Sequence, residues 1–104
     1  MGLYLFQAGF TAACWAEQIE QKTLHLEALD AKVAAFGGNT IGTWLTFGEY
    51  DMVKLLEMPD NATMAAFVLS TTSGGHFSAG KTTVLLSTDE GLAALGQANA
   101  QADG

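Results

Sequence analysis

The chain has 104 residues, with 11 Asp or Glu against 4 Lys, no Arg, and a net charge of −7. This length suits one domain with a single core, and the shortage of basic side chains argues against binding to nucleic acid or to an anionic membrane surface. No apolar run approaches the ~18 residues of a membrane span, and one cysteine excludes an internal disulfide, so we expect a cytoplasmic protein.

The first part of the chain is expected to form a strand and then a long helix. Residues 3–10 are apolar at odd and even positions alike, which is typical of a strand covered on both faces. Thr11 then suits a helix N-cap, and apolar residues spaced by three and four continue to Phe36. The polar residue Lys22 interrupts this stripe, so a break near 20–23 stays open. The Gly-Gly pair after Phe36 ends the helix.

Four shorter elements follow, in the order strand, strand, helix, strand: residues 39–47, 51–58, 61–72 and 81–87. A short Gly-Glu-Tyr connection suits a hairpin between the first two strands, and Asp60 caps the helix that follows Pro59. A Gly-rich loop precedes the last strand. Beyond that strand the chain is small and polar, with one weak helical turn and an end that frays.

The element order β-α-β-β-α-β predicts the ferredoxin-like α+β fold, a four-stranded antiparallel sheet with two helices on one face. This order also bears on GHFSAGKT, residues 75–82, which matches the phosphate-loop pattern G-x-x-x-x-G-K-[ST] at every position. A phosphate loop leads from a strand into a helix N-terminus, whereas here a helix comes first and a β-branched segment follows Lys81. We interpret the match as accidental and expect no bound nucleotide.

The stretch GEYDMVKLLEMPD, residues 48–60, resembles the signature of the GYD-domain family. The matching residues are Gly48, Tyr50, Asp51, Glu57, Pro59 and Asp60. The resemblance covers roughly residues 1–90, which we take as the domain, and leaves 91–104 as a polar tail. It implies a dimeric α+β barrel, in which two ferredoxin-like units pair through their sheets. It implies no particular reaction, because a fold alone does not name one.

Alternation along the two middle strands divides their side chains between two faces. The set expected under the helices is Ile41, Leu45, Phe47, Val53 and Leu55. The set expected on the opposite face is Trp44, Tyr50, Met52, Lys54 and Leu56. A monomer would leave this second, largely apolar face in water. We therefore predict a homodimer in which a partner sheet covers Trp44, Met52, Lys54 and Leu56.

Three residues are candidates for a ligand pocket, and no catalytic residue is assigned. Asp51 either fixes the hairpin by accepting backbone N–H bonds or acts as a proton acceptor in a cleft between the sheet and the first helix. Tyr50 is either an aromatic dimer contact or a phenolic acid. His25 borders the apolar stripe of the helix, where its edge can reach the same cleft.

We expect no metal and no cofactor. Cys14 and His25 would lie about 16 Å apart along a continuous helix, too far to share an ion, and no H-x-x-x-H or C-x-x-C motif occurs. Two functions remain open. One is binding or turnover of a small organic molecule in the cleft, which a cavity lined by His25 or Asp51 would favour. The other is a non-catalytic homodimeric module, which a filled core would favour.

Overall fold

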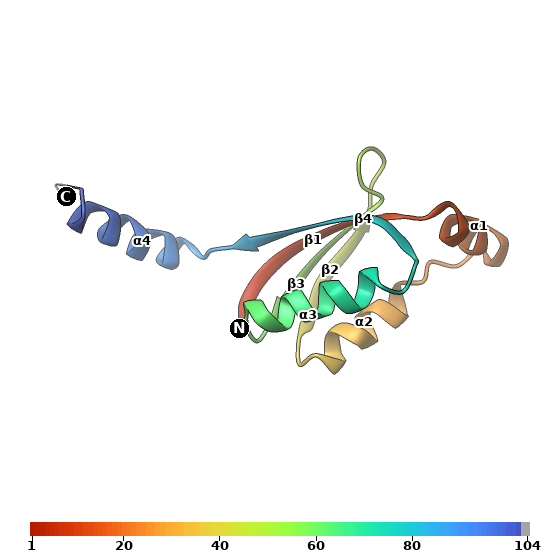
Figure 1. The fold of residues 1–104 in the computed structure, drawn as a ribbon, viewed down its shortest axis with the longest axis horizontal. Helices are drawn as coiled ribbons and strands as arrows, with labels where there is room; N and C mark the ends of the chain where they lie inside the picture. The colour runs from red at the N-terminus through yellow and green to blue at the C-terminus, as the bar shows by residue number, and fades with distance from the viewer. Residues whose placement is uncertain (103–104) are drawn as a thin grey trace.

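The computed structural model describes residues 1–102 and shows an α+β architecture around one antiparallel sheet (Figure 1). The elements are β1 (Gly2–Phe10), α1 (Ala12–Gln21), α2 (Leu26–Ala35), β2 (Asn39–Leu45), β3 (Met52–Met58), α3 (Asn61–Thr72), β4 (Phe77–Leu85) and α4 (Thr88–Ala100). The strands lie in the order β2-β3-β1-β4, and every neighbouring pair is antiparallel. This is the ferredoxin-like arrangement, so the predicted fold class is confirmed.

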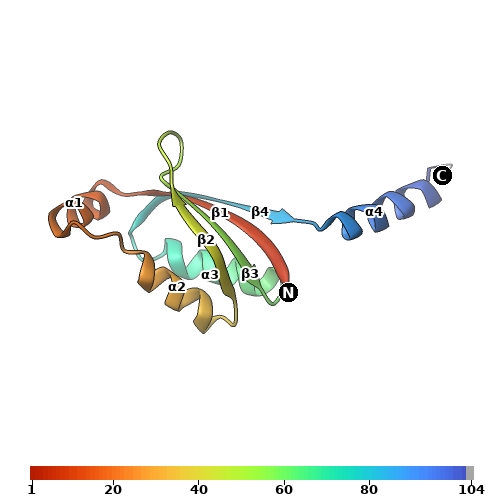
Figure 2. The same cartoon turned by 180° about the vertical axis from the view of Figure 1, so that it is seen from behind.

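The helices take three different positions around the sheet. Helices α2 and α3 lie on one face, α1 lies beyond one end of the sheet, and α4 leads away from the other end (Figures 1 and 2). Among residues 1–102, no helix covers the opposite face, which we call the open face, and the β2–β3 loop projects on that side. Within the same residues, no helix is both long and apolar enough to cross a membrane.

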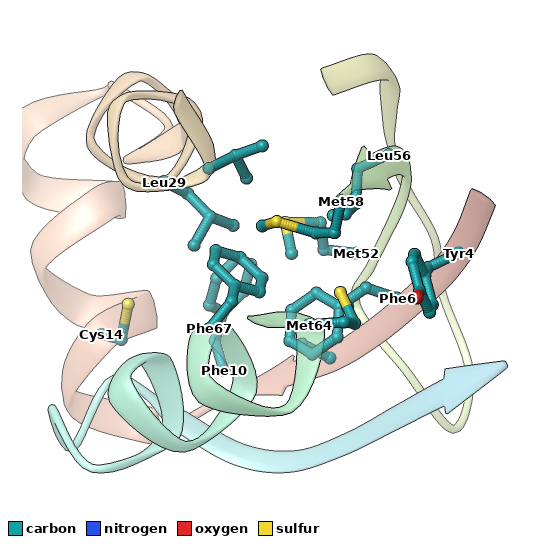
Figure 3. Close-up of a cluster of buried hydrophobic side chains, with 12 residues drawn as sticks. Tyr4, Phe6, Phe10, Cys14, Leu29, Met52, Leu56, Met58, Met64 and Phe67 are labelled. Carbon is teal, nitrogen blue, oxygen red and sulfur yellow. The ribbon is translucent and has the colours of Figure 1, made fainter. Parts of the chain in front are cut away.

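The core fills the space between the sheet and the two covering helices. Alternate side chains of β1 point into it, among them Phe6, which is fully buried. Phe67 of α3 meets this ring edge to face, with ring centroids 5.7 Å apart. Leu29 of α2 and Met58 of β3 close the same cluster (Figure 3). The inward side chains of β1 therefore form the centre of the sheet's packed face.

The local signals for helix ends are confirmed. The Thr11 side chain accepts the N–H of Cys14 at 3.2 Å and caps α1. Asp60 caps α3 by accepting the N–H of Thr63 at 2.8 Å, and hydrogen bonding from the side chain and then the backbone of Thr63 lowers the pKa of the Asp60 carboxyl. Gly37 adopts φ 81° and ends α2, a conformation that glycine takes without the steric cost of a Cβ atom.

The long helix breaks at the position that the sequence left open. Helix α1 ends at Gln21, and its C-cap residue Lys22 adopts the left-handed conformation at φ 53°. The buried side chain of Gln18 then accepts the N–H of His25 at 3.0 Å and holds the connection between the two helices. The chain becomes helical again after His25 and forms α2. This helix runs across the sheet, whereas α1 does not (Figure 1).

The faces predicted for β3 are wrong. Met52, Lys54 and Leu56 are fully buried on the helix-covered side, while Val53 and Leu55 alternate onto the open face and are half-buried. Period-two alternation divides the side chains into two sets but does not show which set faces the helices. The structure gives Lys54 partners within the protein.

Lys54 carries its ammonium group into the core. Its Nζ atom donates to the carboxylate of Asp30 on α2 and to the hydroxyl of Thr43 on β2, the latter at 2.6 Å. The hydroxyl of Thr40 also donates to Asp30 at 3.0 Å. A buried charge is tolerated when it is paired and hydrogen-bonded. These bonds tie α2 to β2 and β3.

The faces of β2 follow the prediction only in part. Trp44 lies opposite Val53 on the open face and is 56% exposed, whereas Leu45 pairs with the first residue of β3 on the helix-covered side. The register shifts at Ile41, which leaves this side chain largely exposed. Phe47 was expected under the helices, but it follows the end of β2 and is fully exposed in the hairpin loop.

The two last elements are longer than predicted. Strand β4 begins at Phe77 instead of residue 81, because β1 offers backbone partners as far as Phe10 and this pairing overrides the low strand propensity of Gly80. Lys81 of the phosphate-loop match therefore lies within a strand. Helix α4 has 13 residues where one weak helical turn was expected, and a capping box of Ser87 and Glu90 starts it.

Removing Asp30 and removing Lys54 should change the stability of the protein by different amounts. Asp30→Ala leaves the buried ammonium without its counter-charge and should lower the free energy of unfolding by about 1–3 kcal/mol. This is less than for a fully buried pair, because the Asp30 side chain is 46% exposed. Lys54→Met removes the charge together with the need for a partner, and should change stability by less than about 1 kcal/mol.

Urea unfolding of both single variants and the double variant measures this difference. In the Lys54→Met background, Asp30→Ala should cost less than about 0.5 kcal/mol, because no buried charge remains to be paired. Equal losses from the two single variants would contradict the role given to the buried ammonium.

Candidate functional site

A cavity of about 360 Å³ opens between α1, α2 and the connection from α3 to β4. Four residues form its apolar wall: Phe10, Ala28, Leu29 and Phe77. The rings of Phe10 and Phe77 stack with centroids 5.5 Å apart and an interplanar angle of 27°. The volume falls at the small end of the range for ligand pockets, and the apolar lining is typical of them.

One polar atom on this wall has no partner. Thr71 of α3 is 4% exposed and lines the cavity. Among the residues that the structure describes, its Oγ1 atom is the one buried side-chain oxygen or nitrogen without a hydrogen bond. Buried hydroxyl groups nearly always have a partner, and leaving one unpaired costs free energy. The Thr71 hydroxyl therefore lies buried and unpaired in a residue that lines the cavity.

Basic side chains line the same space. Lys32 of α2 donates from Nζ to the backbone carbonyl of Ser70 at 3.0 Å, which holds its ammonium next to the residue that precedes Thr71. An ammonium group has three donors, so this bond leaves others for a ligand. His25 and His76 also line the cavity, and no Asp or Glu is among the described lining residues.

One hydrogen bond holds the ring of His25, and another holds the backbone at His76. The ring Nε2 of His25 lies 2.9 Å from Oε1 of Gln21, the last residue of α1. The backbone carbonyl of His76 accepts the N–H of Thr11 at 3.0 Å, which ties the α3–β4 connection to the start of α1. The cavity wall is thus assembled from segments that are distant in the sequence.

Cys14 lies in the cavity wall as a neutral thiol. Burial raises its pKa above the ordinary value, and the nearby carboxylate of Glu17 raises it further. Thiolate is the reactive form, so this environment does not activate Cys14 as a nucleophile. The helix break places Cys14 and His25 on one cavity, which corrects the separation expected for a continuous helix. Within residues 1–102, no three His, Cys, Asp or Glu residues group as metal ligands.

Asp51 lies outside this cavity, at the junction of β1, β3 and α1. Its Oδ2 atom accepts the backbone N–H of Phe10 at 2.9 Å and the indole N–H of Trp15 at 3.3 Å. Its own backbone N–H donates to the carbonyl of Ala8 at 2.9 Å. These bonds favour the anchoring role over that of a proton acceptor, although the backbone amide belongs to β1 and not to the hairpin turn.

The three predicted pocket residues do not come together. His25 lines the cavity, Asp51 bonds to β1 and α1, and Tyr50 borders a separate hollow on the open face, next to the hairpin loop. Sequence reasoning missed Lys32 and Thr71 as site residues. Lys32 offered a signal, since a lysine is uncommon in so acidic a chain, but nothing local distinguished Thr71 from the other threonines of its segment.

The fold and site together define a ferredoxin-like α+β domain with a ligand-sized cavity at the end of its helix layer. The sequence profile described as the GYD domain matches residues 4–95. The chain therefore belongs to the GYD domain family, as its hairpin signature had suggested. No curated protein sequence matches this chain.

Two solved structures share the fold. The crystal structure of MtbAldR superposes with a TM-score of 0.60 at 10% sequence identity, covering 83% of this chain and 53% of that chain. The present chain thus spans about half the length of MtbAldR. The crystal structure of FFRP-DM1 gives a TM-score of 0.57 at 14% identity and covers 83% of this chain and 100% of that one. At these identities the similarity shows the fold alone.

The bonds of Asp51 predict how its variants unfold. Asp51→Ala leaves the backbone N–H of Phe10 and the indole N–H of Trp15 unpaired and should lower the free energy of unfolding by about 1–3 kcal/mol. Asp51→Asn keeps an acceptor oxygen and should lose less. Chemical denaturation measures both, with Glu49→Ala on the exposed loop as a control that stays within about 0.5 kcal/mol of wild type. An alanine variant as stable as wild type would rule out the anchoring role.

Proposed function

We propose that this GYD domain binds a small organic molecule in the cavity between α1, α2 and the α3–β4 connection. The observation that carries this proposal is the unpartnered hydroxyl of Thr71 on the wall of a ligand-sized apolar cavity. Binding pockets combine apolar walls with a few convergent polar groups, and this arrangement has both. We also propose that the protein works in the cytoplasm, where its free thiol at Cys14 would stay reduced.

The second candidate function is that of a non-catalytic homodimeric module. The open face of the sheet favours it. The open face carries apolar side chains from all four strands: Leu3, Leu5, Trp44, Val53, Leu55 and Leu85. Leu5 lies directly opposite Leu55, so the patch is continuous across the central pair of strands. An exposed apolar patch of this kind is typical of a protein interface. We propose that a second copy of the chain covers it.

The two proposals are compatible, because they use opposite sides of the sheet. The cavity lies on the helix-covered side, while the open face is free for a partner sheet. Of the four residues first assigned to the dimer contact, only Trp44 lies on the open face. Its indole packs over Gly42, where a Cβ atom would come within 2.6 Å of the ring.

Cavity binding can be tested by blocking the space. Ala28 lines the cavity from an exposed position on α2, so Ala28→Trp should fill the opening without disturbing the core. We expect small aromatic probes such as indole to shift the amide NMR signals of the cavity residues in wild type. These shifts should fall at least tenfold in Ala28→Trp at the same probe concentration.

Ala34→Trp is the matched control, because Ala34 is also exposed on α2 but does not line the cavity. It should leave the probe-induced shifts unchanged. Shifts that persist in Ala28→Trp, or the absence of shifts for every probe in wild type, would reject binding in this cavity.

The dimer proposal predicts a specific effect of charge on the open face. Trp44→Glu should convert a wild-type dimer to a monomer at micromolar concentration, because the partner sheet would have to bury the carboxylate. Leu69→Glu makes a comparable change on α3, where Leu69 is 70% exposed on the helix-covered side, and should leave the dimer intact. Sedimentation velocity distinguishes these masses. A well-folded wild-type monomer at micromolar concentration would end the proposal.

A further inference from the structure

We infer that the cavity ligand is a small organic anion, a carboxylate attached to an apolar body. This inference rests on the proposed binding function and adds the chemical class of the ligand. It is carried by the distribution of charge and by the hydrogen-bond donors that face the cavity.

The charge around the cavity is opposite to that of the chain as a whole. The net charge is −7, with 11 acidic residues, yet none of these lines the cavity among the described residues. Of the four lysines and two histidines, one lysine and both histidines do line it: Lys32, His25 and His76. Glu17 approaches Cys14 but is itself exposed and outside the lining. The cavity therefore favours a negative ligand in a protein that repels anions elsewhere.

Two of the donor residues come from adjacent elements, α2 and α3. The ammonium of Lys32 is bound to the carbonyl of Ser70, and the next residue along α3 is Thr71, whose hydroxyl has no partner. A carboxylate offers two acceptor oxygens and can take one bond from each of these groups. A neutral amide has no charge to pair with the ammonium, and its N–H₂ group cannot accept a hydrogen bond from either donor. These two groups therefore favour a carboxylate over its amide.

The apolar lining of the cavity indicates which kind of group the carboxylate is attached to. The stacked rings of Phe10 and Phe77, with Leu29, give the same cavity an apolar surface. A phosphate ester is a poorer match, because no arginine is present to form bidentate bonds to phosphate. An aryl or branched-alkyl carboxylate satisfies both the apolar surface and the donors.

Paired probes of equal size test the inference: phenylacetate and phenylacetamide, titrated into the full chain and followed by amide NMR shifts. Phenylacetate should bind at least tenfold more tightly than phenylacetamide. Lys32→Met keeps the apolar stem and should abolish this preference by lowering the affinity for phenylacetate to that for phenylacetamide. Lys22→Met removes the same charge from an exposed position outside the cavity and should preserve the preference.

Thr71→Val gives an independent test, because a methyl group replaces the unpartnered hydroxyl at equal size. The variant should melt at a higher temperature than wild type and bind phenylacetate at least threefold more weakly. A purely structural threonine would not combine these two effects.

The outcomes distinguish an error in the ligand class from an error in the proposed cavity binding. Equal affinity for the two probes would overturn the anionic ligand and leave cavity binding in place. A preference lost equally in Lys22→Met would also overturn it, because the effect would then come from net charge. Binding of neither probe, together with no response to indole, would overturn both the ligand class and the proposed function.

Discussion

A buried ammonium group fixes the position of α2, and the cavity depends on where α2 lies. Lys54 has no exposed surface, so its charge requires partners within the protein. Asp30 on α2 and Thr43 on β2 supply them. Helix α2 itself buries only Leu29 and Val33, a small apolar area for a helix of 10 residues. The ion pair therefore specifies how α2 crosses the sheet, and α2 in turn supplies one wall of the cavity.

Local signals predicted most of the fold, while features set by tertiary contacts escaped prediction. The caps at Thr11 and Asp60 depend on neighbouring residues only, so the sequence was sufficient to place them. The face of β3 depends on whether Lys54 finds a partner on another element, which alternation does not reveal. The start of β4 depends in the same way on the length of β1. The break at Lys22 was visible as an interruption of the apolar stripe but became certain only with the buried bonds of Gln18.

The candidate site was less predictable than the fold, because its residues meet only after α2 returns across the sheet. His25 was found because it borders the apolar stripe of its helix. Lys32 lies one residue from the buried Val33, yet its direction toward α3 follows from the bond to Ser70. His76 lies in the α3–β4 connection, and the bond from its backbone carbonyl to Thr11 holds this connection beside the cavity. Side chains of this kind become a site through packing, without a local motif.

Helix α4 contributes length to the molecule but nothing to its interior. It has no buried residue, and Leu92 and Leu95 remain 66% and 67% exposed. The radius of gyration is 16.6 Å, whereas a compact chain of this size would have roughly 13 Å. The longest dimension of 60 Å is about twice the next, 29 Å. Small-angle scattering is therefore sensitive to α4 above all other elements, since folding this helix onto any surface would shorten the maximum particle dimension while the sheet and cavity stayed as they are.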